Sequence, residues 1–314
     1  MLKYDYSFID TQAKKAGFVR DMFEKTYRLV DILEFIKDDA LLSQVLVLKG
    51  GTAINLTVFN LPRLSVDIDL DYSAEVTREQ MLKNRSVITD RIDKYLTANG
   101  YTQSNKTKRS HALDSFIYEY KNVAGMTDNL KIEINYVLRC HVLSPEDRLV
   151  LFEGKDNNFK IKTVSPIELF ASKIVALLSR SAPRDLYDVY NMVKSDLFNE
   201  SETDFLRRCV VFYSAVNADD SSFILSFNRI KNITQHQILK SLLPVLRKGE
   251  FFNVQIATEV VEDYFSSNLR LTDNDKMFLD AFNEQVYRPD LLFGNTEISK
   301  RLERHPMALW KSKH

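Results

Sequence analysis

Several residue types are scarce in this sequence, and their scarcity excludes whole classes of protein. The 314 residues include only two cysteines, Cys140 and Cys209, which show no CxxC or Cys/His spacing. A disulfide framework and a structural zinc site are therefore excluded, and we expect both cysteines to be reduced thiols in the core. Eight glycines and seven prolines are too few for a disordered, collagenous or turn-dense all-β chain. Helices should dominate.

Net charge and long apolar runs are missing as well. The 43 Lys and Arg residues balance 43 Asp and Glu residues, so any binding to nucleic acid needs a local basic patch. No apolar run approaches the roughly 20 residues of a membrane span, and the N-terminus lacks the pattern of a secretory signal. We therefore expect a soluble cytoplasmic protein that does not contact a membrane.

Two patterns of hydrophobicity divide the chain near residue 160. Before this point, apolar residues recur at helical spacing over residues 8–37 and 77–98. Strand-like runs lie between and after these segments, at residues 45–49, 65–71, 115–120 and 130–137. The last two runs predict an antiparallel hairpin. After it the strand signals fade and helical spacing dominates. We predict an α+β fold with a mixed sheet and N-terminal helices in residues 1–160, followed by a helical domain in residues 161–314.

Carboxylates on strand faces are the first candidates for chemistry. Asp67, Asp69 and Asp71 alternate with apolar residues, so a strand would place all three on one face. Glu133 lies on the polar face of a later strand and is favoured over Glu119, whose strand is shorter and alternates less strongly. Oxygen ligands suit Mg²⁺, and two such ions about 3.5 to 4 Å apart can activate an attacking oxygen and stabilise a leaving pyrophosphate. An isolated DxD is more often a solvated strand face.

A glycine turn precedes the DxD strand. Gly50, Gly51 and Thr52 end a buried strand and begin a helix, which would present backbone N–H groups to a triphosphate. Taken alone, such a turn is most often an ordinary strand-to-helix connection. The combination of motifs is more specific. It consists of Lys49-Gly-Gly-Thr, then Arg63-x-Ser65-x-Asp-x-Asp, and an acid on a later strand. With these motifs the sequence resembles the nucleotidyltransferase superfamily, which has a polymerase-β-like fold.

A second stretch narrows this resemblance. The chain continues with Ser165-Pro-Ile-Glu-Leu-Phe-Ala-Ser-Lys173 and then Arg184-Asp-Leu-Tyr-Asp188. With these motifs it resembles the AbiEii/AbiGii toxin family, which includes the MenT toxins of bacterial abortive-infection and toxin–antitoxin systems. The resemblance covers roughly residues 45–195. It implies a nucleotidyltransferase toxin that moves a nucleoside monophosphate from an NTP to an acceptor, with the 3′ end of tRNA favoured, and that inhibits growth as part of phage defence.

The resemblance also implies site residues, cofactors and partners. The implied catalytic residues are Asp67, Asp69, Glu133, Lys173 and Asp188, of which the first three would hold two Mg²⁺ ions that Mn²⁺ can replace. The implied nucleotide-binding residues are Lys49, Gly50, Gly51, Thr52, Ser65, Lys173 and Arg184. A cognate antitoxin that need not bind the toxin is expected. We further expect Lys173→Ala to fold normally while it loses NTP affinity or turnover.

The sequence leaves open the role of Asp188, the class of acceptor and the role of two basic segments. Asp188 could orient Lys173 or the acceptor, or hold Arg184, with which it would otherwise form an ordinary i, i+4 surface pair. A small-molecule or protein nucleotidyltransferase of the antibiotic-modifying type would share these residues, as would a catalytically silent nucleotide-binding module. Basic residues at 106–111 and at 160–162 could contact a polynucleotide, although such groups are commonly just solvated.

Overall fold

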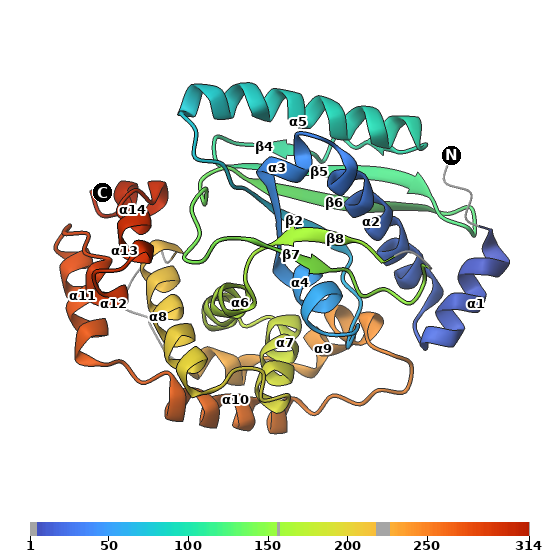
Figure 1. Cartoon of the computed structure of the whole chain (residues 1–314). Helices are drawn as coiled ribbons and strands as arrows, with labels where there is room; N and C mark the ends of the chain where they lie inside the picture. Colours follow the sequence, from blue (N-terminus) through green and yellow to red (C-terminus); the bar gives the residue numbers. More distant parts are fainter. Residues whose placement is uncertain (1–4, 156–157, 218–226, 314) are drawn as a thin grey trace. The chain divides into compact units, whose positions relative to one another are not determined.

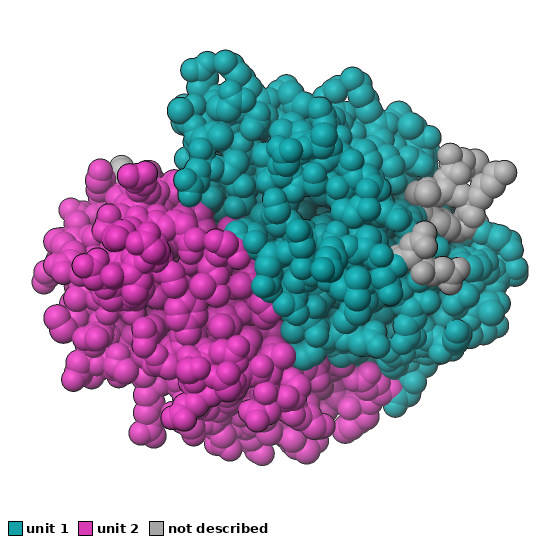
Figure 2. Space-filling model, in the orientation of Figure 1, with its two compact units in different colours: residues 1–139, 145–163, 244–249 teal, residues 140–144, 164–243, 250–314 magenta. Residues whose placement is uncertain are grey.

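The computed structural model describes residues 5–155, 158–217 and 227–313. The chain forms two compact units (Figure 2). Unit 1 comprises residues 1–139, 145–163 and 244–249, and unit 2 comprises residues 140–144, 164–243 and 250–314. The sequence predicts a boundary near residue 160, whereas the two units separate after Thr163. Unit 1 also includes the later segment 244–249, and unit 2 includes the earlier segment 140–144.

Unit 1 is built on one mixed sheet (Figure 1). Its described strands are β1 (Leu46–Lys49), β2 (Asp67–Tyr72), β3 (Thr102–Gln103), β4 (Lys108–Arg109), β5 (Leu113–Lys121), β6 (Thr127–Asn135), β7 (Glu146–Leu149) and β8 (Lys160–Thr163). They lie in the order β3-β5-β6-β2-β1-β8-β7, with β4 paired to β5. The pairs β2–β6 and β1–β8 are parallel and the others antiparallel.

The expected antiparallel hairpin is present as β5 and β6. Sequence reasoning missed β3, β4, β7 and β8, which have only two to four residues each. Such short segments complete too few alternations to produce a recognisable period of two. They extend the sheet at both sides, and β8 adds a parallel partner to β1.

Helices α2 and α5 cover one face of this sheet. The described helices of unit 1 are α1 (Tyr6–Ala16), α2 (Arg20–Asp38), α3 (Leu42–Val45), α4 (Gly50–Ala53), the π-helical η1 (Ile54–Val58) and α5 (Arg78–Ala98). Asn84 of α5 donates to the hydroxyl of buried Tyr72, and Arg28 of α2 lies over the ring of Tyr120. Side chains alternate between the two faces of the sheet along β2. Tyr72 therefore lies on the face that α5 covers, and Asp67 and Asp69 lie on the opposite face.

All regular elements described in unit 2 are helical. They are α6 (Pro166–Arg180), α7 (Pro183–Lys194), α8 (Glu200–Asn217), η3 (Phe227–Asn232), α9 (Gln235–Ser241), α10 (Val254–Asn268), α11 (Asp273–Asn283), α12 (Asp290–Phe293), α13 (Glu297–Leu302) and α14 (Pro306–Lys311), with the 3-10 turn η4 (Leu243–Val245) at the border of the units. Among the described helices of the whole chain, none is both long enough and apolar enough to span a bilayer.

A buried carboxylate fixes the start of α6. Ser165 caps the helix, with its hydroxyl accepting from the backbone N–H of Glu168 at 3.4 Å. The fully buried Glu168 carboxylate accepts backbone hydrogen bonds from Val142 and Leu143 at 2.7 and 2.8 Å and one from the Tyr213 hydroxyl at 2.5 Å. These bonds attach the segment 140–144 to the helical unit.

The two cysteines are free, as their spacing predicts. Cys209 lies in the core, where burial raises the pKa of its thiol. Cys140 is only partly buried, so the expectation that both thiols belong to the core was wrong for this one. It lies at the edge of the short segment 140–144 rather than inside a helix, and irregular segments lie closer to the surface.

Candidate active site

Strand register brings the predicted acids of unit 1 together. Asp69 on β2 pairs directly with Glu133 on β6, and Asp67 lies two residues earlier on the same face of β2. On the other side, Asp69 pairs with Lys49 of β1. Because directly paired residues project to the same face of a sheet, Lys49, Asp69 and Glu133 form one row across three strands. All three are partly exposed.

The alternative acid, Glu119, lies elsewhere on the sheet. It pairs with Asn129, whereas the residue of β5 that pairs with Glu133 is Ser115, four positions away. Its carboxylate accepts a hydrogen bond from Ser104 at 2.8 Å. At about 3.3 Å per residue, this offset places Glu119 roughly 13 Å along the strand from the row that contains Asp69. The register therefore favours Glu133.

The two glycines at the start of α4 are closely packed, and the first of them requires glycine. Gly50 has φ = +69°, and a Cβ there would lie 2.4 Å from Oδ2 of Asp69. A Cβ at Gly51 would lie 2.7 Å from a guanidinium nitrogen of the buried Arg63. A left-handed backbone and this close approach both exclude larger side chains at Gly50. The turn thus packs directly against the carboxylate of Asp69.

Three of the predicted nucleotide-binding side chains form internal contacts in unit 1. Thr52 is fully buried, and its hydroxyl is hydrogen-bonded to the hydroxyl of Ser65, itself buried, at 2.8 Å and to the backbone carbonyl of Asp67. These two hydroxyls therefore attach the start of α4 to β2. Lys49 forms a 2.5 Å ion pair with Asp71, whose side chain is only 4% exposed. The sequence pattern places Asp71 on the same strand face as Asp67 and Asp69, and the ion pair with Lys49 lies on that face.

A lysine that sequence reasoning missed lies among the acids. The ammonium of Lys131 on β6 is 2.8 Å from Oε1 of Glu133. Burial lowers the pKa of Lys131, but the hydrogen bond with Glu133 and the charges of Glu133, Asp67 and Asp69 outweigh it and raise the pKa above its usual value. Lys131 lies two positions before Glu133 in the alternating pattern, so the period of two places it on the same face.

The donor chemistry of this face fits a hard divalent cation. Asp67, Asp69 and Glu133 offer only carboxylate oxygens, the ligand type that Mg²⁺ prefers, and the influence of all three on the Lys131 pKa shows a common negative field. Within the described residues, however, no three His, Cys, Asp or Glu side chains already stand in a metal-binding arrangement. The carboxylates would have to converge from their present rotamers to bind an ion together.

Two further predicted residues, Lys173 and Asp188, belong to a buried ionic cluster in unit 2. Lys173 of α6 lies 2.9 Å from Asp185 and 3.3 Å from Asp188, both on α7, and Arg180 contacts Asp185 at 2.7 Å. The side chain of Lys173 is 8% exposed and those of both aspartates are 1% exposed. Lys173 is therefore not the solvated helix lysine of the simplest interpretation, and its removal cannot leave stability untouched.

Asp185 is a second residue that sequence reasoning missed. Burial raises its pKa, but the charges of Lys173 and Arg180 and their hydrogen bonds prevail and hold the pKa at about 2. Asp185 and Asp188 are three residues apart on α7, so both can face the same neighbouring helix. This spacing was visible in the sequence, although only the packing of α6 against α7 assigns the two carboxylates to one lysine. The contact with Lys173 favours the first of the roles left open for Asp188.

Arg184 makes a different contact. Its Nε donates to the backbone carbonyl of Ser241, at the end of α9, at 2.6 Å. This bond attaches α7 to α9 within unit 2. Whether Arg184 also binds a nucleotide stays a prediction.

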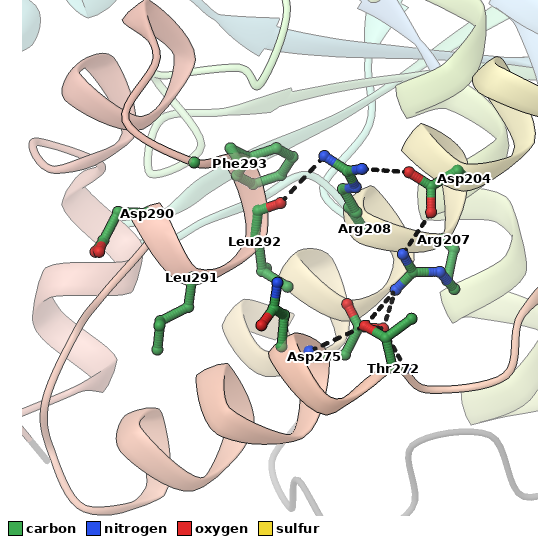
Figure 3. Close-up of a pocket in the computed structure, with 11 residues that line it drawn as sticks. Asp204, Arg207, Arg208, Thr272, Asp275, Asp290, Leu291, Leu292 and Phe293 are labelled. Atoms are coloured by element: carbon green, nitrogen blue, oxygen red, sulfur yellow. Dashed lines mark hydrogen bonds and ion pairs between the residues drawn. The ribbon is translucent and has the colours of Figure 1, made fainter.

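A pocket of about 400 Å³ lies elsewhere in unit 2 (Figure 3). Arg207 and Arg208 of α8 point toward it, but Arg207 pairs with Asp204 and Asp275, and Arg208 pairs with Asp204. Arg208 also donates to the carbonyl of Leu292 at 3.5 Å. The cations of this pocket are thus compensated by neighbouring carboxylates, which disfavours the binding of an anion there.

Comparisons with known proteins identify the family and the fold of the chain. A family model described as "Nucleotidyl transferase AbiEii toxin, Type IV TA system" matches residues 34–284. Among solved structures, the chain is similar to MenT4, a nucleotidyltransferase toxin from Mycobacterium tuberculosis H37Rv, with a TM-score of 0.62, 15% sequence identity, and 98% of this chain and 99% of that chain covered. At this identity the likeness establishes the fold. No curated protein matches significantly.

Proposed function

Because the chain belongs to the AbiEii family of nucleotidyltransferase toxins of type IV toxin–antitoxin systems, we propose that it transfers a nucleoside monophosphate from an NTP to the 3′ end of tRNA in a Mg²⁺-dependent reaction. The observation that carries this proposal is the direct pairing of Asp69 with Glu133 beside the glycine turn. A strand acid pair next to a turn that exposes backbone N–H groups suits a triphosphate and its counter-ions.

Each residue of this face has a role in the proposed reaction. Asp67, Asp69 and Glu133 would hold two Mg²⁺ ions, for which Mn²⁺ can substitute. Divalent ions of this kind, which nucleotidyltransferases generally use, stabilise the charge that develops on the phosphates. Gly50 and Gly51 bring the backbone close to the phosphates. The side chains of Thr52 and Ser65 hold that turn on β2, so their contribution to nucleotide binding comes through the backbone.

The chemistry consists of one displacement. The acceptor hydroxyl oxygen attacks the α-phosphorus of the NTP, a new O–P bond forms, the bond from the α-phosphorus to the bridging oxygen breaks, and pyrophosphate leaves. Glu133 receives the proton of the attacking hydroxyl. Lys131, 2.8 Å from the Glu133 carboxylate, holds that carboxylate in position through their ion pair. Lys49 holds the neighbouring Asp71 in the same way.

Lys173, Asp188 and Arg184 stay in the proposal on the strength of the family resemblance. An ammonium suits the phosphates of an NTP, which carry more charge than two divalent ions neutralise. The carboxylates of Asp185 and Asp188 hold the ammonium of Lys173 in a fixed position. Replacement of Lys173 by Arg tests this role, because it retains the charge but changes the geometry of the donors.

The acceptor is tested by incubating the pure chain with total RNA and each α-labelled NTP. We expect label in the tRNA fraction with wild type and none with Asp69→Asn, which preserves the packing against Gly50. Asp90→Asn, on an exposed face of α5, is the matched control and should match wild type. Label in protein or in a small molecule instead would replace tRNA as the acceptor, and metal-dependent NTP binding without turnover would identify a silent module.

The cellular role is tested by expression. The proposal places the toxin in the cytoplasm, where NTPs and tRNA occur, with a cognate antitoxin that need not bind it. Expression of wild type without the antitoxin should arrest bacterial growth, whereas Asp67→Ala should permit growth. Equal arrest by both chains would show that nucleotide transfer is not the cause.

A further inference from the structure

A basic groove of about 770 Å³ adjoins the acids on the same face of the sheet. Its lining includes Lys106, Lys108, Ser115, Lys131 and Glu133. Ser115 on β5 pairs with Glu133 on one side and with Lys108 of β4 on the other. The row that begins with Lys49 and Asp69 therefore continues through Glu133 and Ser115 to Lys108, at the far end of the groove.

The charge of the groove is not compensated. Lys131 is paired with Glu133, and Arg109, which also lines the groove, lies 3.1 Å from Asp114. Lys106 and Lys108 are exposed, and no described residue forms an ion pair or a hydrogen bond with either ammonium group. Two free cations beside a glutamate that is already paired leave the groove positive, so it attracts an anionic ligand and repels a cationic one.

The groove and the glycine turn lie on opposite sides of the acids. Gly50 follows β1 and contacts Asp69, whereas the groove begins at Glu133 and extends over β5 to β4. In the proposed reaction the triphosphate occupies the β1 side, so an acceptor that approaches Glu133 must come from the groove side. We propose that this groove binds the phosphate backbone of the acceptor RNA, with Lys106 and Lys108 as phosphate contacts that lead the 3′ hydroxyl to Glu133. This inference rests on the proposed function.

Two observations favour this surface over its rivals. The other basic pair, Lys160 and Lys162, lies on β8 beyond β1, on the side of the glycine turn, and Lys162 already donates to the carbonyl of Gln44 at 3.3 Å. A positive groove also disfavours a cationic small-molecule acceptor. A polyanion with regularly spaced phosphates matches two lysines that are two residues apart on one segment.

The test is the double charge reversal Lys106→Glu/Lys108→Glu in the full chain. The control is Lys83→Glu/Lys94→Glu on α5, where both lysines are exposed and each pairs with an acid four residues away. Binding of deacylated, fluorophore-labelled bulk tRNA is measured by anisotropy over a salt series, and KM is measured separately for tRNA and for NTP. Thermal unfolding midpoints check the fold, and Lys106→Gln/Lys108→Gln serves as a milder variant.

We expect the reversal to weaken tRNA binding roughly tenfold and to reduce the slope of log Kd against log salt by about 1.4 to 1.8, since each phosphate contact contributes about 0.7 in single strands and 0.9 in duplexes. KM for NTP and the control variant should stay unchanged, and the glutamine variant should show a smaller loss.

Several results would overturn the inference. If the Lys106→Glu/Lys108→Glu variant has the same tRNA affinity and salt slope as wild type, the inference is wrong. The proposed function still stands in that case, provided that wild type labels tRNA. A raised KM for NTP with unchanged tRNA binding would assign the groove to the nucleotide. Absence of tRNA binding by wild type would also overturn it. If wild type labels protein instead but the reversal abolishes tRNA binding, the groove is an RNA site and the proposed function alone fails.

Discussion

Replacement of Lys173 by alanine should destabilise the protein, contrary to what its position in the sequence suggests. The substitution removes from Asp185 and Asp188, each 1% exposed, the buried ammonium that contacts both, while the ion pair of Asp185 with Arg180, whose side chain is 64% exposed, stays in place. Removing one partner of a buried ion pair typically costs about 3 to 5 kcal/mol, because the other charge stays buried without compensation. Against a typical stability of about 5 to 15 kcal/mol, this is a large fraction.

The pH dependence of the same variant gives a signed test. In wild type, the pKa of Asp185 is about 2, below its usual 3.8. The stabilisation that Asp185 provides is therefore present above about pH 3.8 and is lost as the pH falls through 2, and by linkage it amounts to about 2 kcal/mol. Without the charge of Lys173, burial should raise the pKa of Asp185 from its value in wild type. The stability deficit of the variant relative to wild type should then shrink as the pH falls from 6 toward 4, because groups common to both proteins cancel in this difference.

The assay is chemical denaturation followed by circular dichroism at several pH values. Lys276→Ala is the control, since this lysine is 58% exposed and forms only an i, i+3 pair with Asp273. Its effect should stay within about 0.5 kcal/mol. A Lys173→Ala protein as stable as wild type, with the same pH profile, would refute the buried-cluster argument. Lost transfer in such a stable protein would instead identify Lys173 purely as a nucleotide ligand.

Three further outcomes follow from the structure. Gly50→Ala should lose most transfer in the labelled-NTP assay, because its left-handed backbone and the 2.4 Å approach to Asp69 force that carboxylate to move. Glu133→Gln should lose transfer while Glu119→Gln retains it; the reverse result would place the third acid on β5. His305→Asn should preserve the cap of α14, where Nδ1 accepts from a backbone N–H. Burial and His141 lower the pKa of His305 to about 4, so wild type should lose about 3 kcal/mol as the pH falls from 6.5 to 4. Denaturation of the asparagine variant should lack this loss.

The sequence by itself determined the local features of the site. A period of two along residues 65–71 places Asp67 and Asp69 on one face, because this depends only on the alternation of side chains within a strand. The glycine pair, with the strand before it and the helix after it, is equally local. The hairpin of β5 and β6 follows from two apolar runs separated by a short turn. For these features the pattern and the structure coincide.

Only the tertiary structure decided which distant residues meet. Glu133 lies beside Asp69 because β6 pairs in parallel with β2, although α5 and several strands separate them in the chain. The register of β5 against β6 places Glu119 four positions from Ser115, the residue that pairs with Glu133. Strand order and register result from packing the whole sheet, and no local period encodes them.

Burial is the second property that required the tertiary structure. Lys173 and Asp188 are charged residues on amphipathic helices, and such residues are usually solvated. The packing of α6 against α7 buries them with Asp185 and turns a surface pattern into an ionic cluster. Conversely, Lys108 on β4 and Lys106 in the turn before that strand line the end of a groove, where no described carboxylate pairs with either ammonium group. Helical or strand period sets the direction of a side chain, but the neighbouring element decides what it meets.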